Sequence, residues 1–156
     1  MNGQTKNQNL TTIGWREWVQ LPELGLPWLK AKIDTGARTS CLHAFSLDTF
    51  DKNQERWVRF GIHPHQDDSE FEVYCEARII DERQVTDSGG HREKRLVIST
   101  LLSLGEAQWP IEITLTNRDN MKFRMLLGRT AMEGKVAVNP EASFLLGKPP
   151  GRKYPY

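Results

Sequence analysis

The 156-residue chain has few of the features that would mark a specialised class of protein. It lacks the ~20 consecutive apolar residues of a membrane span, and its polar residues 1–8 do not resemble the apolar core of a signal peptide. Lysine and arginine number 21 against 20 acidic residues, so the net charge of +1 argues against wholesale binding to nucleic acid or anionic membrane. These features predict a cytoplasmic protein with no membrane partner.

Cysteine and histidine are also scarce. The two cysteines, Cys41 and Cys75, are predicted to be reduced residues of the core, with a disulfide between them as the alternative. The histidines are scattered: His43, His63, His65 and His91. There is no His-Glu-x-x-His motif, so no metal site is predicted; a zinc site made from Cys41, His43 and a distant third ligand is the alternative. No glycine-rich phosphate loop is present, and we expect no cofactor.

Alternating apolar and polar residues over short segments predict an all-β protein. The expected strands are 13–20, 26–33, 56–62, 70–81, 92–103, 109–116 and 122–127, with a hairpin turn at 21–25. One short helix is expected over 129–133, ended by Gly134. A chain of this length can bury one core, so we expect a single domain at 13–147, a flexible N-terminal arm at 1–12 and a tail at 148–156.

The most informative segment is Asp34-Thr35-Gly36-Ala37, which follows the predicted strand 26–33. Gly36 can take backbone angles closed to other residues and leave its N–H pointing at a carboxylate. The Thr35 hydroxyl is both donor and acceptor, so it could tie this turn to a facing copy of itself. The alternative is an ordinary turn in which the Asp34 side chain bonds only its own backbone.

A second apolar segment far downstream ends in Leu126-Leu127-Gly128-Arg129. The pair of segments resembles the retropepsin-like aspartic proteases, in which an Asp-Thr-Gly-Ala strand lies beside a late strand ending in Gly-Arg. Segments 15–25 and 30–40 extend this likeness to a bacterial, RimB-like branch, formerly labelled ATP-dependent zinc protease and linked with ATP-grasp ligases that add glutamates to a ribosomal protein. The resemblance covers 13–147 and implies a retropepsin-like closed barrel with one short helix and a flap hairpin.

Only one Asp-Thr-Gly segment is present, so the resemblance implies a homodimer in which each subunit contributes one Asp34. Two carboxylates held close together cannot both ionise cheaply, so such a pair shares one proton. The ionised member would activate water, and the protonated member would donate to the scissile carbonyl. The expected catalytic segment is Asp34, Thr35 and Gly36. Ala37 stands where pepsin-like sequences often carry serine, and it removes a hydroxyl donor to the ionised carboxylate.

The residue after this segment, Arg38, predicts an acidic substrate. Retroviral relatives commonly carry there an aspartate that pairs with the arginine of the Gly-Arg segment, here Arg129. Unless another acid such as Asp48 or Asp51 compensates, two guanidinium groups per subunit lie near the cleft. Guanidinium groups bind carboxylates through paired, charge-assisted hydrogen bonds.

Segment 81–95 has a polar, glycine-centred tip between two expected strands, and we expect it to be the flap that closes over a peptide. The expected substrate-binding residues are Ala37, Arg38, Val85, Arg92, Arg95 and Arg129. The alternative for the basic flap residues His91, Arg92, Lys94 and Arg95 is that they face solvent or pair with Asp81, Glu82 and Glu93.

The leading hypothesis is therefore a dimeric aspartic endopeptidase that cuts acidic or poly-glutamate-bearing protein, such as a ribosomal protein modified by an ATP-grasp ligase. The alternative is a non-catalytic binding module on the same fold, which holds acidic tails or presents a partner to a ligase. RNA binding through the basic hairpin and through Arg152 and Lys153 of the tail is a third hypothesis, weakened by the near-zero net charge.

Overall fold

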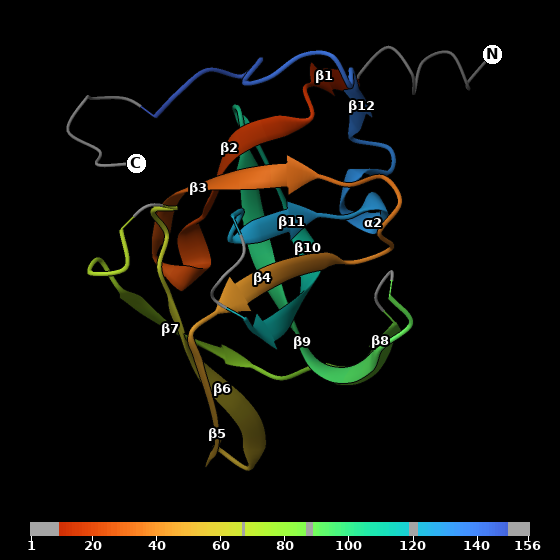
Figure 1. The fold of residues 1–156 in the computed structure, drawn as a ribbon. Helices are drawn as coiled ribbons and strands as arrows, with labels where there is room; N and C mark the ends of the chain where they lie inside the picture. The colour runs from red at the N-terminus through yellow and green to blue at the C-terminus, as the bar shows by residue number, and fades with distance from the viewer. Residues whose placement is uncertain (1–9, 67, 87–88, 119–121, 150–156) are drawn as a thin grey trace.

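The computed structural model describes residues 10–66, 68–86, 89–118 and 122–149 (Figure 1). Its strands are β1 (Thr11–Ile13), β2 (Arg16–Leu21), β3 (Leu26–Ile33), β4 (Ser40–Ala44), β5 (Ser46–Lys52), β6 (Glu55–Ile62), β7 (Val73–Arg78), β8 (Asp81–Thr86), β9 (Arg92–Leu104), β10 (Ala107–Asn117), β11 (Met125–Leu127) and β12 (Val136–Val138). The helical elements are the 3₁₀ turn η1 (Pro22–Leu24) and the helix α2 (Arg129–Met132). The all-β prediction with one short α-helix is confirmed.

One sheet closes on itself to form a barrel. Its strand order is β10-β4-β11-β3-β2-β9, and β9 pairs back onto β10 in a long antiparallel ladder. The shortest pairing in this ring is between β2 and β9, where Gln20 lies opposite Ser103. Strand β8 pairs with β9 outside the ring and forms the expected hairpin, whose tip at 87–88 lies outside the described residues. The predicted retropepsin-like barrel with a flap hairpin is confirmed.

The hydrophobic core lies inside this barrel. Alternate side chains of the ring strands point inward, and the fully buried ones include Leu21, Leu26, Leu29, Leu42, Leu102, Ile113 and Met125. Burying each such side chain stabilises the fold by ~1.5–3 kcal/mol. The barrel walls are therefore rigid supports for the loops that join them.

Strand β11 lies between β3 and β4, although it comes about ninety residues later in the chain (Figure 1). It runs parallel to β3, with Leu127 beside Ile33, and antiparallel to β4, with Met125 beside Leu42. The Asp34 N–H donates to the Leu127 carbonyl at 2.9 Å. This arrangement brings the two segments that carry the family resemblance side by side.

A second sheet, with the order β5-β6-β7, extends away from the barrel at the bottom of Figure 1. The sequence predicted β6 closely but missed β5, which is mostly polar and exposed. The expected strand 70–81 is wrong in its length, because the chain leaves this sheet after β7. The Ile79 N–H donates to Arg56 of β6, whereas the Ile80 N–H donates to Val97 of β9 in the barrel.

The expected strand 13–20 is also wrong, because it is broken at Gly14 and Trp15. Gly14 packs so tightly on the C-terminal segment 139–147 that a Cβ there would lie 2.2 Å from the Ala142 carbonyl oxygen. Residues on either side form β1 and β2, and β1 pairs in parallel with β12. Strand β1 begins at Thr11, inside the predicted N-terminal arm, of which residues 1–9 lie outside the described part of the chain.

A buried carboxylate fastens the C-terminal segment to the barrel. Glu17 is fully buried, and its two oxygens accept the N–H groups of Gly14 at 2.7 Å, Leu145 at 2.8 Å and Leu146 at 3.1 Å. Nearby, the Trp18 and Phe144 rings stack with centroids 6.0 Å apart. One side chain therefore satisfies backbone donors from both ends of the domain.

In the described residues no helix is long and apolar enough to cross a membrane.

We predict that Glu17→Gln destabilises the fold by about 2–4 kcal/mol, because an amide has one acceptor oxygen and its NH₂ group would face backbone donors. The measurement is the free energy of unfolding in urea. Glu141→Gln, an exposed change in the same C-terminal segment, is the matched control. Equal unfolding midpoints for the two variants would contradict this role of Glu17.

Candidate active site

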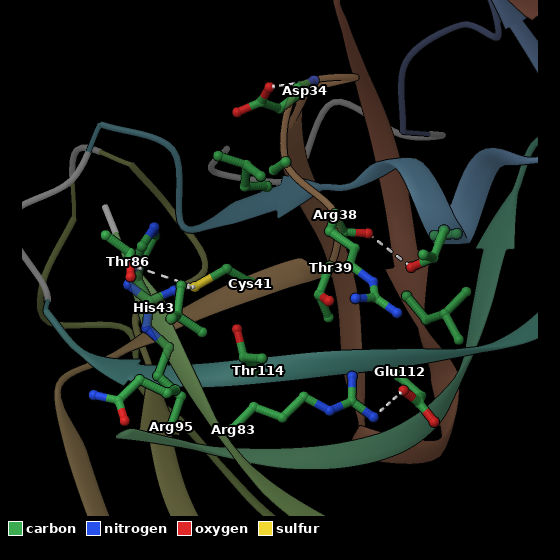
Figure 2. Close-up of a pocket in the computed structure, with 18 of the residues that line it drawn as sticks. Asp34, Arg38, Thr39, Cys41, His43, Arg83, Thr86, Arg95, Glu112 and Thr114 are labelled. Carbon is green, nitrogen blue, oxygen red and sulfur yellow. Dashed lines mark hydrogen bonds and ion pairs between the residues drawn. The ribbon is translucent and has the colours of Figure 1, made fainter. Parts of the chain in front are cut away.

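Asp34 begins the turn that follows β3, and its half-buried carboxylate is held by that turn (Figure 2). The Gly36 N–H donates to Asp34 Oδ1 at 3.0 Å, and the Ala37 N–H donates to the Asp34 carbonyl at 3.2 Å. The predicted contact from the Gly36 N–H is confirmed. Gly36 can take backbone angles closed to other residues but does not use them here, because it is not among the glycines with positive φ in the described chain. Its small size matters instead, since a Cβ would lie 3.3 Å from Asp34 Oδ1.

The end of β11 supports this turn from below. Gly128 packs against the chain at Thr39, where a Cβ would lie 2.6 Å from the Thr39 carbonyl carbon, and its N–H donates to Ser40 Oγ at 3.0 Å. The next N–H, that of Arg129, donates to the Ala37 carbonyl at 2.7 Å. Only glycine allows β11 to approach so closely. The Gly-Arg segment thus fixes the backbone on which Asp34 depends.

Arg129 does not line the cleft, but its side chain binds the backbone of the Asp34 turn. Its Nη1 donates to the Thr35 carbonyl at 3.3 Å, and its Nε lies 3.9 Å from a Glu133 carboxylate oxygen. The suggestion that Asp48 or Asp51 compensates for the missing partner of Arg129 is wrong. Both lie on β5 in the second sheet, in register with Arg59 and Arg56 respectively.

A cleft of about 1270 Å³ extends from the Asp34 turn to the β8–β9 hairpin (Figure 2). The predicted site residues that line it are Asp34, Gly36, Ala37, Arg38, Val85 and Arg95. Three other predicted residues, Thr35, Arg92 and Arg129, are not among the lining residues. Arg92 is exposed on the hairpin, and Thr35 is exposed on the turn.

Four arginines line the cleft: Arg38, Arg83, Arg95 and Arg118. Arg83 is neutralised by two acids, since its Nη2 donates to Glu112 at 2.7 Å (Figure 2) and its Nε donates to Asp81 at 2.8 Å. Arg83 and Arg118 were not predicted as site residues from the sequence. Their placement depends on the pairing register, which sets Arg83 opposite Arg95, and on the point where β10 ends.

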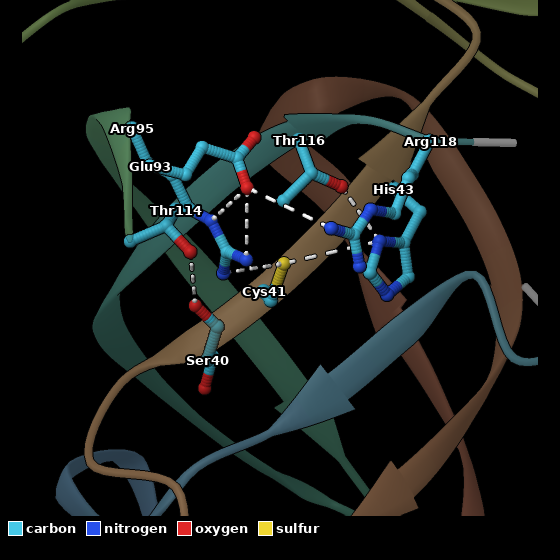
Figure 3. Close-up of polar contacts among 8 residues, drawn as sticks. All are labelled: Ser40, Cys41, His43, Glu93, Arg95, Thr114, Thr116 and Arg118. Carbon is cyan, nitrogen blue, oxygen red and sulfur yellow. Dashed lines mark hydrogen bonds and ion pairs between the residues drawn. The ribbon is translucent and has the colours of Figure 1, made fainter. Parts of the chain in front are cut away.

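One end of the cleft holds a cluster of polar groups around Cys41 (Figure 3). Cys41 Sγ lies 4.0 Å from His43 Nδ1 and accepts from Arg95 Nη1 at 3.7 Å, while His43 Nδ1 is hydrogen-bonded to Thr116 Oγ1 at 2.6 Å. Burial raises the pKa of the Cys41 thiol, with Arg95 opposing that shift. Burial, followed by the positive charges of Arg95 and Arg118, lowers the pKa of His43 to about 4.

These pKa shifts leave a protonated thiol and a neutral imidazole near pH 7, which differs from the thiolate of an activated cysteine nucleophile. Both cysteines are free; Cys75 lies on β7, where burial raises the pKa of its thiol to about 12. Across the described chain, no three His, Cys, Asp or Glu side chains gather as a metal site. Cys41 and His43 do meet, but the neighbouring guanidinium groups oppose a bound cation.

The chain is similar to proteins of known family and of known structure. The chain matches the family model described as retropepsin-like aspartic endopeptidase RimB over residues 12–149. A crystal structure of a Legionella pneumophila protein of unknown function superposes with a TM-score of 0.72 at 27% identity, and the match covers 87% of this chain and 98% of that one.

Curated relatives carry the name "Probable alpha-L-glutamate ligase". The one from Shewanella pealeana is 45% identical over 142 residues, covering 91% of this chain and 31% of that protein. The one from Parasynechococcus marenigrum is 50% identical over 135 residues, covering 86% and 29%. The chain thus spans less than a third of the length of these relatives. Because the family model covers most of the chain, and because the closed barrel carries an Asp-Thr-Gly turn beside a Gly-Arg strand, this chain belongs to the RimB-like family of retropepsin-like aspartic endopeptidases.

Proposed function

We propose that this chain is an aspartic peptidase that acts as a homodimer, with one Asp34 from each subunit activating water for peptide-bond hydrolysis. The observation that carries this proposal is the placement of Asp34. Its carboxylate lies in the cleft, Gly36 donates to one of its oxygens, and its backbone is anchored to β11. An aspartate that only completed a turn would not need a cleft in front of it.

The homodimer supplies the second carboxylate that the chemistry requires. The chain has one Asp-Thr-Gly segment, and Thr35 and Gly36 are exposed, so a second copy can reach the turn. A two-fold axis beside the turn would bring the same residue of each subunit together. The Thr35 hydroxyl is then free to bond across that axis, because a hydroxyl both donates and accepts.

In the proposed reaction the two Asp34 carboxylates share one proton, since two adjacent charges cannot both persist cheaply. The ionised member takes a proton from water as that water attacks the scissile carbonyl. The protonated member donates to the carbonyl oxygen, and a proton then passes to the leaving amine. No covalent intermediate forms. The β8–β9 hairpin, which lines the cleft, would cover an extended peptide and keep bulk water away.

Acidic or glutamate-modified polypeptides are the proposed substrates, and the cytoplasm is the proposed location. Arg38, Arg95 and Arg118 present guanidinium groups to the cleft, where they would pair with substrate carboxylates. The naming of curated relatives as glutamate ligases supports the same class, because such a ligase produces glutamate-bearing chains. A ribosomal protein carrying added glutamates is one such substrate.

We expect Asp34→Asn to lower kcat on a glutamate-rich peptide by at least about 10³-fold, because it removes the acid–base pair while leaving the turn intact. Asp48→Asn, an exposed change on β5, is the control and should be fully active. Hydrolysis is followed by mass spectrometry with and without a metal chelator. Cleavage by Asp34→Asn, or loss of wild-type activity in chelator, would contradict the mechanism.

The same variant separates hydrolysis from a second candidate function. Because the chain matches less than a third of proteins named as ligases, it could instead serve as a module that holds acidic tails for such an enzyme. In that case neither the wild type nor Asp34→Asn cleaves the peptide, and both bind it equally.

We predict that Arg38→Ala lowers kcat/KM on the glutamate-rich peptide by roughly tenfold, the loss of about one charge-assisted hydrogen bond, with little effect on a glutamine-rich peptide of the same length. Arg92→Ala is the matched control, because Arg92 is exposed and does not line the cleft. If Arg38→Ala lowered the rates on both peptides by the same factor, Arg38 would have no part in recognising acidic residues.

A further inference from the structure

The Arg95 guanidinium is nearly buried in the wall of the cleft and makes few contacts with oxygen. Its side chain is 11% exposed. The Nε and Nη2 groups both donate to a single oxygen, Glu93 Oε1, at 3.3 Å, and Nη1 faces Cys41 Sγ at 3.7 Å. A thiol is a weak acceptor, so this guanidinium lacks the paired carboxylate oxygens that its planar fork suits.

Arg118 approaches the same acid from the other side (Figure 3). Its Nη2 lies 4.0 Å from Glu93 Oε1. Both arginines line the cleft, whereas Glu93 is not among the lining residues. Two guanidinium groups thus share one carboxylate oxygen at distances longer than those of a strong charged hydrogen bond, and within the described part of the chain one positive charge is left over. Arg83 in the same cleft differs, since two acids hold it at 2.7 and 2.8 Å.

Among the described residues, the other groups in this part of the cleft do not supply the missing negative charge. His43 is hydrogen-bonded to Thr116, and the Thr114 hydroxyl donates to the Ser40 carbonyl at 3.1 Å. The pKa of His43 is lowered by burial and by both arginines, which is the effect of a positive local potential. These neutral side chains therefore surround two guanidinium groups whose positive charge Glu93 only partly balances.

We propose that Arg95 and Arg118 form a carboxylate-binding subsite, and that Glu93 occupies it until an acidic side chain of the substrate takes its place. This inference rests on the proposed function. Figure 2 shows Arg95 and Asp34 at opposite ends of the cleft, so the subsite selects an acidic residue removed from the scissile bond rather than next to it. Glu93 is then an internal competitor, which sets how strongly one carboxylate is favoured over a neutral side chain.

The experiment measures peptide binding in the Asp34→Asn background, where no cleavage is expected, by fluorescence anisotropy with labelled glutamate-rich and glutamine-rich peptides. Adding Arg95→Gln should weaken binding of the glutamate-rich peptide by roughly tenfold and leave the glutamine-rich peptide almost unchanged. Adding Glu93→Gln should do the opposite and tighten binding of the glutamate-rich peptide by about threefold or more, because the competitor is removed. Arg92→Gln, on the same hairpin but outside the cleft lining, should change neither.

The gain expected for Glu93→Gln cannot arise from poor folding, so it tests the subsite even if Arg95→Gln is unstable. Unchanged or weaker binding of the glutamate-rich peptide by Glu93→Gln would overturn the subsite. If these shifts in affinity appear but the wild type cleaves neither peptide, the subsite stands and the peptidase function fails. If the wild type cleaves and neither variant changes the preference for glutamate, the peptidase stands and the subsite fails.

Discussion

The site depends on the insertion of β11 between β3 and β4. Its last residue accepts the Asp34 N–H, and the glycine that follows lets the chain pass against Thr39 and reach the Ala37 carbonyl. These backbone contacts hold a turn that has no regular structure of its own. Because the three strands belong to a closed barrel, the turn cannot shift without disturbing packed walls on both sides. These contacts hold the Asp34 carboxylate at the edge of the cleft, and each chain carries one such aspartate.

The second feature of the cleft, after the fixed Asp34 turn, is the uneven charge of its walls. Acidic neighbours neutralise some of the arginines at its walls, and they do so unequally. Arg83 is held closely by two acids, whereas Arg95 and Arg118 share one distant oxygen. The described residues beside them are neutral, hydrogen-bonded groups: His43 with Thr116, and Thr114 with Ser40. If the cleft binds peptide as proposed, such differences in its wall would decide which side chains it favours and in what register the peptide binds.

Features set by adjacent residues could be predicted from the sequence, whereas features that depend on contacts between distant segments could not. Strand β3 and the Asp34 turn follow from alternation and a glycine, which are features of adjacent residues. Strand β4 was missed because all of its residues are buried and show no alternation, and β5 because it is mostly polar. Arg118 lies in the cleft wall because β10 ends one residue before it, and Glu133 lies near Arg129 because the two are one helical turn apart.

The most direct measurement of the central claim, that each chain holds half of an active site, is a mixing titration. Asp34→Asn chains are added to a fixed concentration of wild type and allowed to exchange subunits while peptide hydrolysis is followed. If two Asp34 residues from two chains form the site, an equimolar mixture should retain roughly half of the wild-type rate, since random pairing places half of the wild-type chains in mixed dimers. A rate that stays unchanged at every ratio would contradict the shared site.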